Sequence, residues 1–273
     1  MLFSDQLVLI RGGGDLATGV AYRLHQAGFP IIVLELERPL VVRRKVALAT
    51  AVLAGSVQIE DLHGQLVHSV AEAEQLVHSE TVPVLVAPDL APVITHLQTP
   101  ISILVDARIA KRNIDTHISQ APLVIGMGPG FTAGVDCHAV IETMRGHSLG
   151  RVYWAGSALP NTGTPGIVAG KGAERVLRAP QAGKVNWQLA IGDSVEAGNV
   201  IGDVDGVPVL APFAGVVRGL IAAETAVTPG LKIGDVDPRG IRDHCFTISD
   251  KALALGGAVL SAILAFHNRQ NRV

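Results

Sequence analysis

The first part of the chain alternates between short apolar runs and segments with helical spacing. Leu7–Arg11 is an apolar run that leads into three glycines, and apolar residues recur every four positions between residues 15 and 27. Ile31–Leu34 is a second unbroken apolar run, of the kind that is buried on both faces of a parallel sheet. The pattern therefore predicts a strand, a glycine turn, a helix and a second strand.

Three more apolar runs follow, with helix-like segments between them. They predict strands over Val82–Val86, Ile101–Val105 and Leu123–Ile125. Strands that alternate with helices favour an α/β fold with a parallel sheet. We expect residues 1–120 to form a Rossmann-like nucleotide-binding domain, and residues 121–175 to connect it to the rest of the chain.

The second half of the chain contains an internal repeat. The Ala-Pro, Gly and Val positions of Ala179–Val185 recur 32 residues later in Ala211–Val217. Val195, Gly198 and Ile201–Val204 recur as Val227, Gly230 and Ile233–Val236. This pattern resembles the biotinyl/lipoyl-type barrel-sandwich domain, which we expect over residues 176–247. In such carrier domains the hairpin between the repeats presents a lysine, but Asp203–Pro208 has none. We therefore expect no covalent biotin or lipoate.

The last segment, residues 248–273, is expected to form a helix that packs on the core. Ser249 or Asp250 is placed to cap it, and Gly256 and Gly257 would let another backbone approach closely. Its apolar stretch, residues 252–266, is shorter than the ~20 residues that a membrane-spanning helix needs. We therefore expect no membrane association.

The charge balance excludes one class of partner. The chain has 22 Lys and Arg against 24 Asp and Glu, which gives a net charge of −2 and no basic footprint for nucleic acid. The amino-terminal residues lack the basic segment of a secretory signal, and two cysteines suggest no disulfide framework. We expect a cytoplasmic protein with a small-molecule or protein partner, and a homo-oligomer stays open.

The glycine turn is the first candidate binding site. Gly12, Gly13, Gly14 and Asp15 lie between a predicted strand and a predicted helix, where backbone N–H groups can approach phosphate oxygens. Glu35 follows at the end of the second strand, where a carboxylate can accept from ribose hydroxyls. The turn predicts a dinucleotide site; the alternative is that Asp15 caps the helix and that no nucleotide binds.

Other polar residues follow the ends of the predicted strands, and together they favour one ligand site for phosphate or carboxylate. A second glycine segment is either an anion-binding nest or a tight turn. The residues are Arg43, Arg44, Asp106, Arg108, Lys111 and Arg112, with Gly126, Gly128 and Gly130 in the second glycine segment.

Both cysteines lie in Asp/Cys/His triplets, at residues 136–138 and 243–245. Thiolate and imidazole bind metals, but adjacent residues of a strand point to opposite faces, so a site requires the two triplets to meet. A buried, inert cysteine is the alternative. As catalytic residues we nominate Cys137 and His138, because an adjacent histidine lowers a thiol pKa.

Long motifs spread over nearly the whole chain resemble the YqeB-type family of selenium-dependent molybdenum hydroxylase accessory proteins. The glycine-turn half is loosely similar to the Rossmann part of xanthine dehydrogenase maturation factors. The resemblance implies a cytoplasmic protein that binds molybdopterin dinucleotide, or handles its sulfur or selenium ligand, with a molybdenum hydroxylase client or other maturation proteins as partners. The motifs are RGGGDLATG, LELERPLVVRR, DARIAKRN, IGMGPGFTAGVDCHAVIETMRGHSLGRV, GSALPNTGTPG, KIGDVDPRG and TISDKALALGGAVL.

Two other functions stay open. The first is an NAD-linked oxidoreductase, in which Glu35 would contact the ribose and His138, Lys111 or Asp106 would act as acid or base. The second is a non-catalytic scaffold that docks a partner enzyme through the barrel. In the maturation hypothesis, Cys137 relays sulfur or selenium, which requires an exposed thiol with a lowered pKa.

Overall fold

The structure, a computed structural model, describes residues 1–164 and 166–270. The chain divides into two compact units. Unit 1 comprises Met1–Pro39, Ala47–Thr162 and Ile248–Val273, and unit 2 comprises Leu40–Val46 and Gly163–Thr247. Each unit is therefore built from segments that are separated in the sequence.

Unit 1 contains a nine-stranded sheet with the strand order β10-β9-β7-β6-β1-β2-β5-β4-β3. The strands from β9 to β4 are parallel to their neighbours, whereas β10 and β3 pair antiparallel at the two edges. A separate small sheet pairs β8 with β11. The bounds are β1 (Leu7–Arg11), β2 (Ile31–Glu35), β3 (Ser56–Ile59), β4 (Leu62–Val67), β5 (Thr81–Val86), β6 (Ile101–Asp106), β7 (Leu123–Met127), β8 (Thr132–Ala133), β9 (Ala139–Ile141), β10 (Val152–Tyr153) and β11 (Gly156–Ser157).

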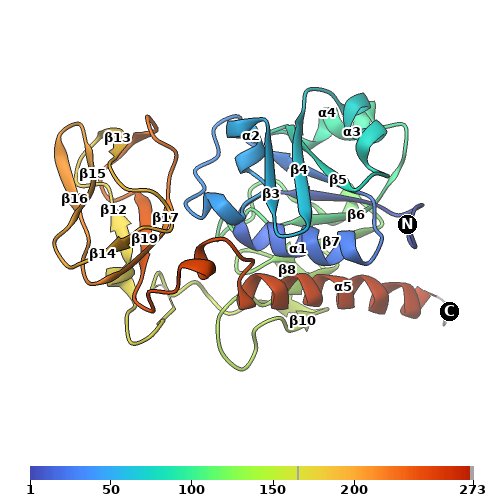
Figure 1. The fold of residues 1–273 in the computed structure, drawn as a ribbon. Helices are drawn as coiled ribbons and strands as arrows, with labels where there is room; N and C mark the ends of the chain where they lie inside the picture. Colours follow the sequence, from blue (N-terminus) through green and yellow to red (C-terminus); the bar gives the residue numbers. More distant parts are fainter. Residues whose placement is uncertain (165, 271–273) are drawn as a thin grey trace. The chain divides into compact units, whose positions relative to one another are not determined.

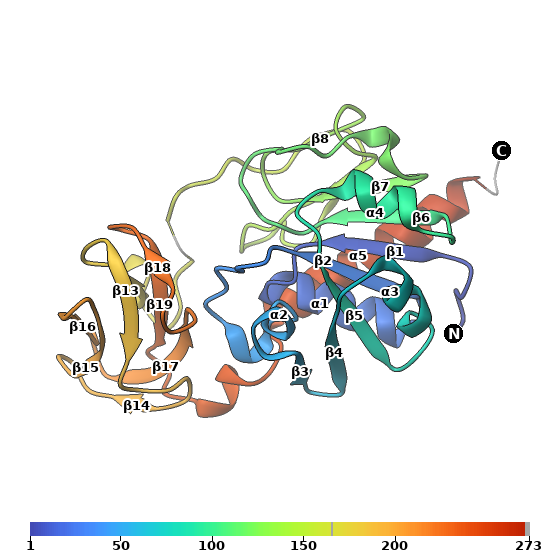
Figure 2. The same cartoon turned by 90° about the horizontal axis from the view of Figure 1, so that it is seen from above.

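Helices cover both faces of this sheet. Figures 1 and 2 show α1 and α5 side by side on one face, with α3 and α4 on the other. Helices α1 and α5 cross closely, because Gly19 of α1 and Gly256 of α5 allow the two backbones to come into contact. The bounds are α1 (Asp15–Gln26), α2 (Thr50–Ala54), α3 (Val70–Leu76), α4 (Leu90–His96), α5 (Asp250–Gln270) and the 3₁₀ turn η2 (Ile118–Gln120).

The expected Rossmann-like open parallel sheet over residues 1–120 is wrong. The individual strands β1, β2, β5 and β6 lie where the apolar runs predict them, but the sheet is mixed and continues through β7, β9 and β10 beyond residue 120. The antiparallel strand β3 is mostly exposed, so it lacks the apolar run that identifies a buried strand. The sheet is therefore open and ends in an antiparallel strand at each edge.

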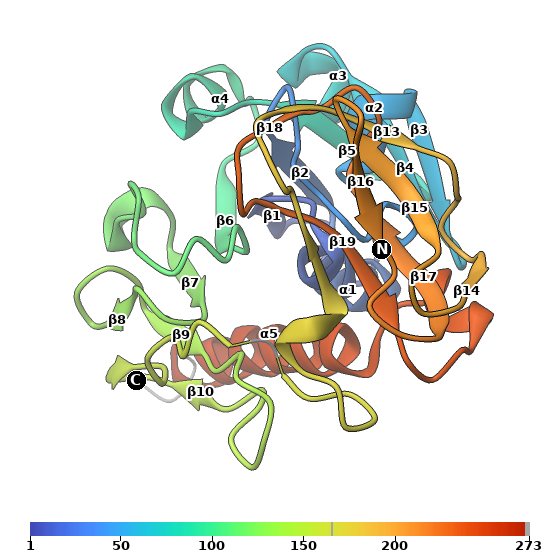
Figure 3. The same ribbon diagram turned by 90° about the vertical axis from the view of Figure 1, so that its left-hand side faces the viewer.

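Unit 2 consists of two four-stranded sheets, with strand orders β12-β19-β17-β14 and β16-β15-β13-β18. Figure 3 looks onto this unit, with β17 beside β19. Strands β17, β18 and β19 begin 32 positions after β13, β14 and β15, respectively. The bounds are η1 (Arg44–Val46), η3 (Ala173–Arg175), β12 (Val176–Arg178), β13 (Gly183–Trp187), β14 (Ser194–Val195), β15 (Val200–Val204), β16 (Val207–Leu210), β17 (Gly215–Leu220), β18 (Ala226–Val227), β19 (Lys232–Asp237) and η4 (Arg242–Cys245).

The expectation of a separate, lipoyl-like barrel-sandwich domain is also wrong. Unit 2 is not one continuous stretch of chain, because residues 40–46 belong to it. Val42 packs directly on Gly219 of β17, where a Cβ atom would lie 2.8 Å from the Val42 carbonyl oxygen. The repeat was recognisable in the sequence, but the contribution of residues 40–46 was not.

Helix α5 is long and apolar enough to cross a membrane, by length and composition alone. Its buried residues include Leu255, Val259 and Ile263, and it packs along α1. Packing within unit 1 accounts for the apolar character of the face of α5 that carries these buried residues. Among residues 1–164 and 166–270, α5 is the one helix of this kind, and the cytoplasmic location stays a prediction.

Candidate functional site

The glycine turn joins β1 to α1, and its three glycines have different surroundings. A Cβ atom on Gly12 would lie 3.2 Å from the Arg108 backbone, and one on Gly13 would lie 2.8 Å from the Ala49 nitrogen. Gly14 has no neighbour within 4 Å of such an atom, and as the N-cap of α1 it supplies no side-chain hydrogen bond. The first turn of α1 is thus approachable, and its N–H groups carry the positive end of the helix dipole.

Glu35 fixes this turn from the end of β2. Its Oε1 accepts a hydrogen bond from the Gly13 N–H at 2.7 Å, and its Oε2 accepts one from the Leu36 N–H at 2.7 Å. Each carboxylate oxygen has a further lone pair with which it can accept. Glu35 thus positions the turn, and its contact with a ribose stays a prediction.

Asp106 and Arg108, at the end of β6, belong to an internal network of charges. The Arg108 guanidinium donates to Asp106 at 3.0 and 2.6 Å and to Asp115 at 2.7 Å. The buried Arg11 donates to both Asp115 oxygens, and these hydrogen bonds hold the pKa of Asp115 below its usual value. The Thr116 hydroxyl donates to Asp106 at 2.6 Å. These groups are engaged with one another and hold β1 against β6.

Lys111 was expected at this edge of the sheet, and the structure adds Lys251 from the first turn of α5. Burial lowers the pKa of the Lys251 ammonium, and the positive charges of Lys111 and Arg145 lower it further, whereas Asp15 and Glu142 act in the opposite direction. Desolvation also lowers the pKa of Lys111. We call Lys111 and Lys251 the lysine pair.

Lys251 of the lysine pair lies close to the beginning of α1. Asp15, the first residue of α1, acts electrostatically on Lys251, and Ala252 packs against Gly19 one turn further along that helix. Among the residues that the structure describes, neither ammonium group takes part in an ion pair. Two ammonium groups near an approachable helix N-terminus form a site that can bind a phosphate or another oxyanion.

The site lies where the sheet changes its direction of growth. From β1, the chain adds β2 on one side, whereas β6 flanks β1 on the other. In open α/β sheets, ligands collect beyond the carboxyl ends of the strands at such a point. The topology therefore places the glycine turn at the edge where a ligand is expected.

The second glycine segment is closed by packing. Cβ atoms would meet the Phe131 ring at Gly126, the Thr143 hydroxyl at 2.7 Å from Gly128, and the Arg112 backbone at 2.5 Å from Gly130. The Asn113 N–H donates to the Gly130 carbonyl oxygen at 3.1 Å. These glycines allow segments of unit 1 to touch, so the structure favours the tight turn over the anion-binding nest.

Arg43 and Arg44 belong to unit 2. The Arg43 Nη2 donates to the His244 carbonyl oxygen at 3.0 Å, and the Arg44 Nε donates to the Leu220 carbonyl oxygen at 2.7 Å. Burial lowers the pKa of Arg44. Both side chains bind unit 2 backbone, whereas the sequence grouped them with the residues that follow the unit 1 strands.

Cys137 is completely buried in unit 1, and burial raises the pKa of its thiol to about 11. His138 Nδ1 accepts a hydrogen bond from the Val124 N–H at 3.0 Å, and burial lowers the pKa of this imidazole. A sulfur relay needs an exposed thiol with a lowered pKa, and the structure meets neither condition.

The second cysteine, Cys245, lies in unit 2, where its Sγ is 3.6 Å from the Val217 carbonyl oxygen. Desolvation raises the pKa of this thiol as well. Within residues 1–164 and 166–270, no group of three or more His, Cys, Asp and Glu side chains is arranged to hold a metal ion. The described residues therefore provide no metal site around either triplet.

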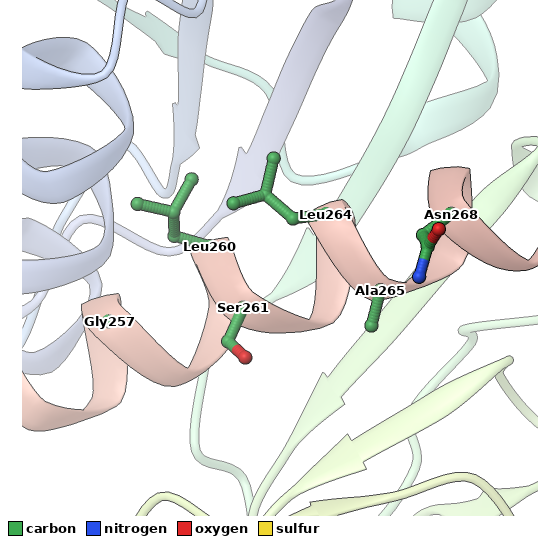
Figure 4. A pocket seen from close by; sticks show the side chains of 6 residues that line it. All are labelled: Gly257, Leu260, Ser261, Leu264, Ala265 and Asn268. Carbon is green, nitrogen blue, oxygen red and sulfur yellow. The ribbon is translucent and has the colours of Figure 1, made fainter.

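A hollow of about 530 Å³ lies along α5 and is lined by small and apolar residues and by Asn268. Figure 4 shows that Leu260 and Leu264 project from one side of the helix, with Ser261 and Ala265 on the other. No charged side chain lines this hollow. It therefore lacks the groups that hold a phosphate.

The sequence supplied the glycine turn and Lys111, but it missed Lys251, Arg11 and Asp115. Lys251 gives one signal that could have identified it, because a lysine in the first turn of a helix opposes the helix dipole. A residue type that is locally unfavourable often serves a function. The pairing of Arg11 with Asp115, 104 residues away, leaves no comparable trace in the sequence.

No family model matches the chain. Two solved structures are similar at low level: an aspartoacylase family protein from Mesorhizobium loti, with 12% identity and a TM-score of 0.26, and a succinylglutamate desuccinylase/aspartoacylase from Rhodobacter sphaeroides, with 13% identity and a TM-score of 0.24. In each case 85% of this chain and 84% of the other are covered. At such TM-scores the likeness carries no argument about fold or activity.

A protein of Escherichia coli (strain K12), "Uncharacterized protein YqeB", is 48% identical over 259 residues. The match covers 95% of this chain and 47% of the relative, so the chain spans about half the length of the curated relative that it matches. None of the three names mentions molybdenum or selenium. The identity over most of this chain supports the predicted resemblance to the YqeB-type family.

Proposed function

We propose that unit 1 binds the phosphates of a dinucleotide between the amino-terminal end of α1 and the lysine pair. The observation that carries the proposal is the combination of an approachable Gly14 with two ammonium groups, Lys111 and Lys251, that have no ion pair among the described residues. Like charges repel each other, and an anion between them relieves that repulsion. A pyrophosphate adds negative charge to that of Asp15 and Glu142, which already act on Lys251.

The finer part of the proposal is that the ligand is a molybdopterin dinucleotide, bound by an accessory protein that matures selenium-dependent molybdenum hydroxylases. Its support is the resemblance of the long motifs to that accessory family. Partners are then a client hydroxylase or other maturation proteins. The proposal assigns binding of the dinucleotide to unit 1 and gives Cys137 no role in sulfur transfer, because its thiol is buried.

The oxidoreductase alternative receives no comparable support from the geometry. Asp106 is occupied by Arg108 and Thr116, and His138 Nδ1 by the Val124 N–H. Of the acid–base groups nominated for hydride transfer, only Lys111 lies in the lysine pair. A phosphate-binding role uses that lysine in its charged form and requires no proton transfer.

The experiment that tests this function is mass spectrometry of the small molecules released when the protein, purified from a molybdenum-replete host, is denatured. A metal assay of the same sample accompanies it. We expect a pterin dinucleotide in near-stoichiometric amount, and its loss from the Lys251→Met variant purified in parallel. Release of NAD alone would contradict the accessory role but remain consistent with dinucleotide binding. If the protein is released empty and binds no pyrophosphate, the accessory role and dinucleotide binding are both contradicted.

A further inference from the structure

A pocket of about 280 Å³ lies in unit 1 at the carboxyl ends of β4 and β5. Leu85 and Val93 are buried and form apolar walls, together with the half-buried Val70 at the beginning of α3. Its polar lining residues, His68, Ser69, Asp89 and His96, are all exposed. An apolar slot with a few polar groups at its edge suits a flat heteroaromatic ring.

The pocket is connected to the glycine turn through β2. The Ala87 N–H, in the pocket lining, donates to the Glu35 carbonyl oxygen at 2.9 Å, and the Glu35 carboxylate accepts from Gly13. Strand β5 is the second neighbour of β1 in the sheet, which corresponds to a separation of about 10 Å. This distance along the sheet is roughly the length of one nucleoside. A ligand that reaches from α1 to the pocket also passes over the carboxyl edge of the sheet, because α1 lies on one face and α3 and α4 on the other.

The rim offers hydrogen-bond acceptors. His96 Nδ1 lies 2.6 Å from the Pro92 carbonyl oxygen, so Nδ1 carries the hydrogen, and Nε2 is the acceptor in the neutral ring. Asp89 precedes α4, and its carboxylate makes no capping hydrogen bond to that helix. Acceptors at the edge of a slot select a ring that presents N–H donors, such as an exocyclic amine.

We propose that this pocket binds an amine-bearing nucleobase, whose attached phosphates occupy the site at α1 and the lysine pair. The inference rests on the proposed function for the position of the phosphates. It adds the position of the base, the residues that surround it and a preference among bases. The hydrophobic walls hold the ring faces, and Asp89 accepts from the amine.

The test is isothermal titration of the full chain with inorganic pyrophosphate, CDP and UDP. Apolar contacts in the pocket are expected to make CDP bind about tenfold more tightly than pyrophosphate. CDP is expected to bind more tightly than UDP, because UDP carries a carbonyl oxygen where CDP carries the amine. Asp89→Asn should remove that preference, since an amide can donate as well as accept.

A matched pair of variants separates the pocket from the phosphate site. Ala87→Phe fills the pocket, whereas Ala91→Phe places the same side chain on the exposed surface of α4, outside the pocket. We expect Ala87→Phe alone to reduce CDP affinity to that of pyrophosphate. Thermal unfolding of both variants checks that they are folded.

The outcomes distinguish the two proposals. If pyrophosphate binds but CDP binds no more tightly, or if Ala87→Phe leaves CDP affinity unchanged, the base pocket is wrong and the phosphate site stands. If Ala87→Phe abolishes CDP binding and Lys251→Met does not affect it, the phosphate site is wrong and the base pocket stands. If none of the three probes binds, both are wrong.

Discussion

Unit 1 contains two glycine segments after parallel strands, and the structure gives them opposite roles. At residues 12–14, two glycines make close contacts, and Gly14 is left open at the beginning of α1. At residues 126–130, all three alternate glycines are covered, by Phe131, Thr143 and the Arg112 backbone. Glycine therefore marks a close approach in both places, and only the surroundings decide whether the chain itself or a ligand fills the space.

The largest effect is expected from Gly130→Ala. Gly130 has φ +109°, and a Cβ atom would lie 2.5 Å from the Arg112 backbone, so backbone strain and a clash act together. We expect a loss of about 3 kcal/mol or more in the free energy of unfolding, measured with urea. Gly134→Ala is the matched control, because Gly134 also has positive φ but an added Cβ atom meets nothing. Equal losses in both variants would show that Arg112 does not close the segment.

Lys251→Met should have the opposite character to Gly130→Ala: we expect it to reduce ligand binding more than stability. A lost charge-assisted hydrogen bond to phosphate corresponds to about 1.5–3 kcal/mol, or tenfold or more in pyrophosphate affinity. Without ligand, the variant should be as stable as the parent or more so, because burial and the charges of Lys111 and Arg145 disfavour the ammonium. The exposed Lys184→Met is the control, with affinity unchanged. A large loss of stability with normal affinity would make Lys251 a structural residue.

The sequence predicts the glycine turn as a candidate site because the strands and the helix that frame it are local. Periodicity defines β1, α1 and β2 within about thirty residues, and the glycine turn is read directly between them. Lys251 reaches the same place from the other end of the chain through the crossing of α1 and α5. No local pattern encodes that crossing, except the small residues that permit it.

The errors about the fold have the same physical origin. Strand β3 is largely exposed, and its antiparallel partner β4 carries polar residues at several positions, so neither has an unbroken apolar run. Residues 40–46 join unit 2 through contacts such as Val42 with Gly219. Pairings between distant segments depend on surfaces that exist only after folding, and a single sequence does not display them.

Gly14→Ala is expected to have a smaller effect. Its φ of −64° is accessible to alanine, so stability should fall by about 0.5–1 kcal/mol, the cost of alanine at a helix N-cap. The added methyl group occupies the space in front of the first turn and should weaken pyrophosphate binding a few-fold. Circular dichroism and calorimetric titration measure the two effects separately. Unchanged affinity would place the phosphate elsewhere.

The smallest effect is a pH dependence of stability. Folding lowers the pKa of Lys251 below its ordinary value of 10.5, so near that pH the unfolded chain binds the proton more tightly than the folded chain. This contribution to the free energy of unfolding should therefore increase as the pH rises toward 10.5, and the penalty is fully present at lower pH. The difference between the parent and Lys251→Met, measured by urea unfolding at several pH values, isolates it. If the free energy of unfolding of the parent, relative to that of Lys251→Met, decreased as the pH rises toward 10.5, the lowered pKa of Lys251 would be contradicted.

The most direct measurement of the central claim is a pyrophosphate titration followed by the backbone amide resonances of the glycines in both segments. We predict saturable shifts at Gly14, Asp15 and the following amides of α1, with Gly128 and Gly130 unaffected. The opposite result, saturable shifts at Gly128 and Gly130 with α1 unaffected, or no saturable shift at all, would contradict the account.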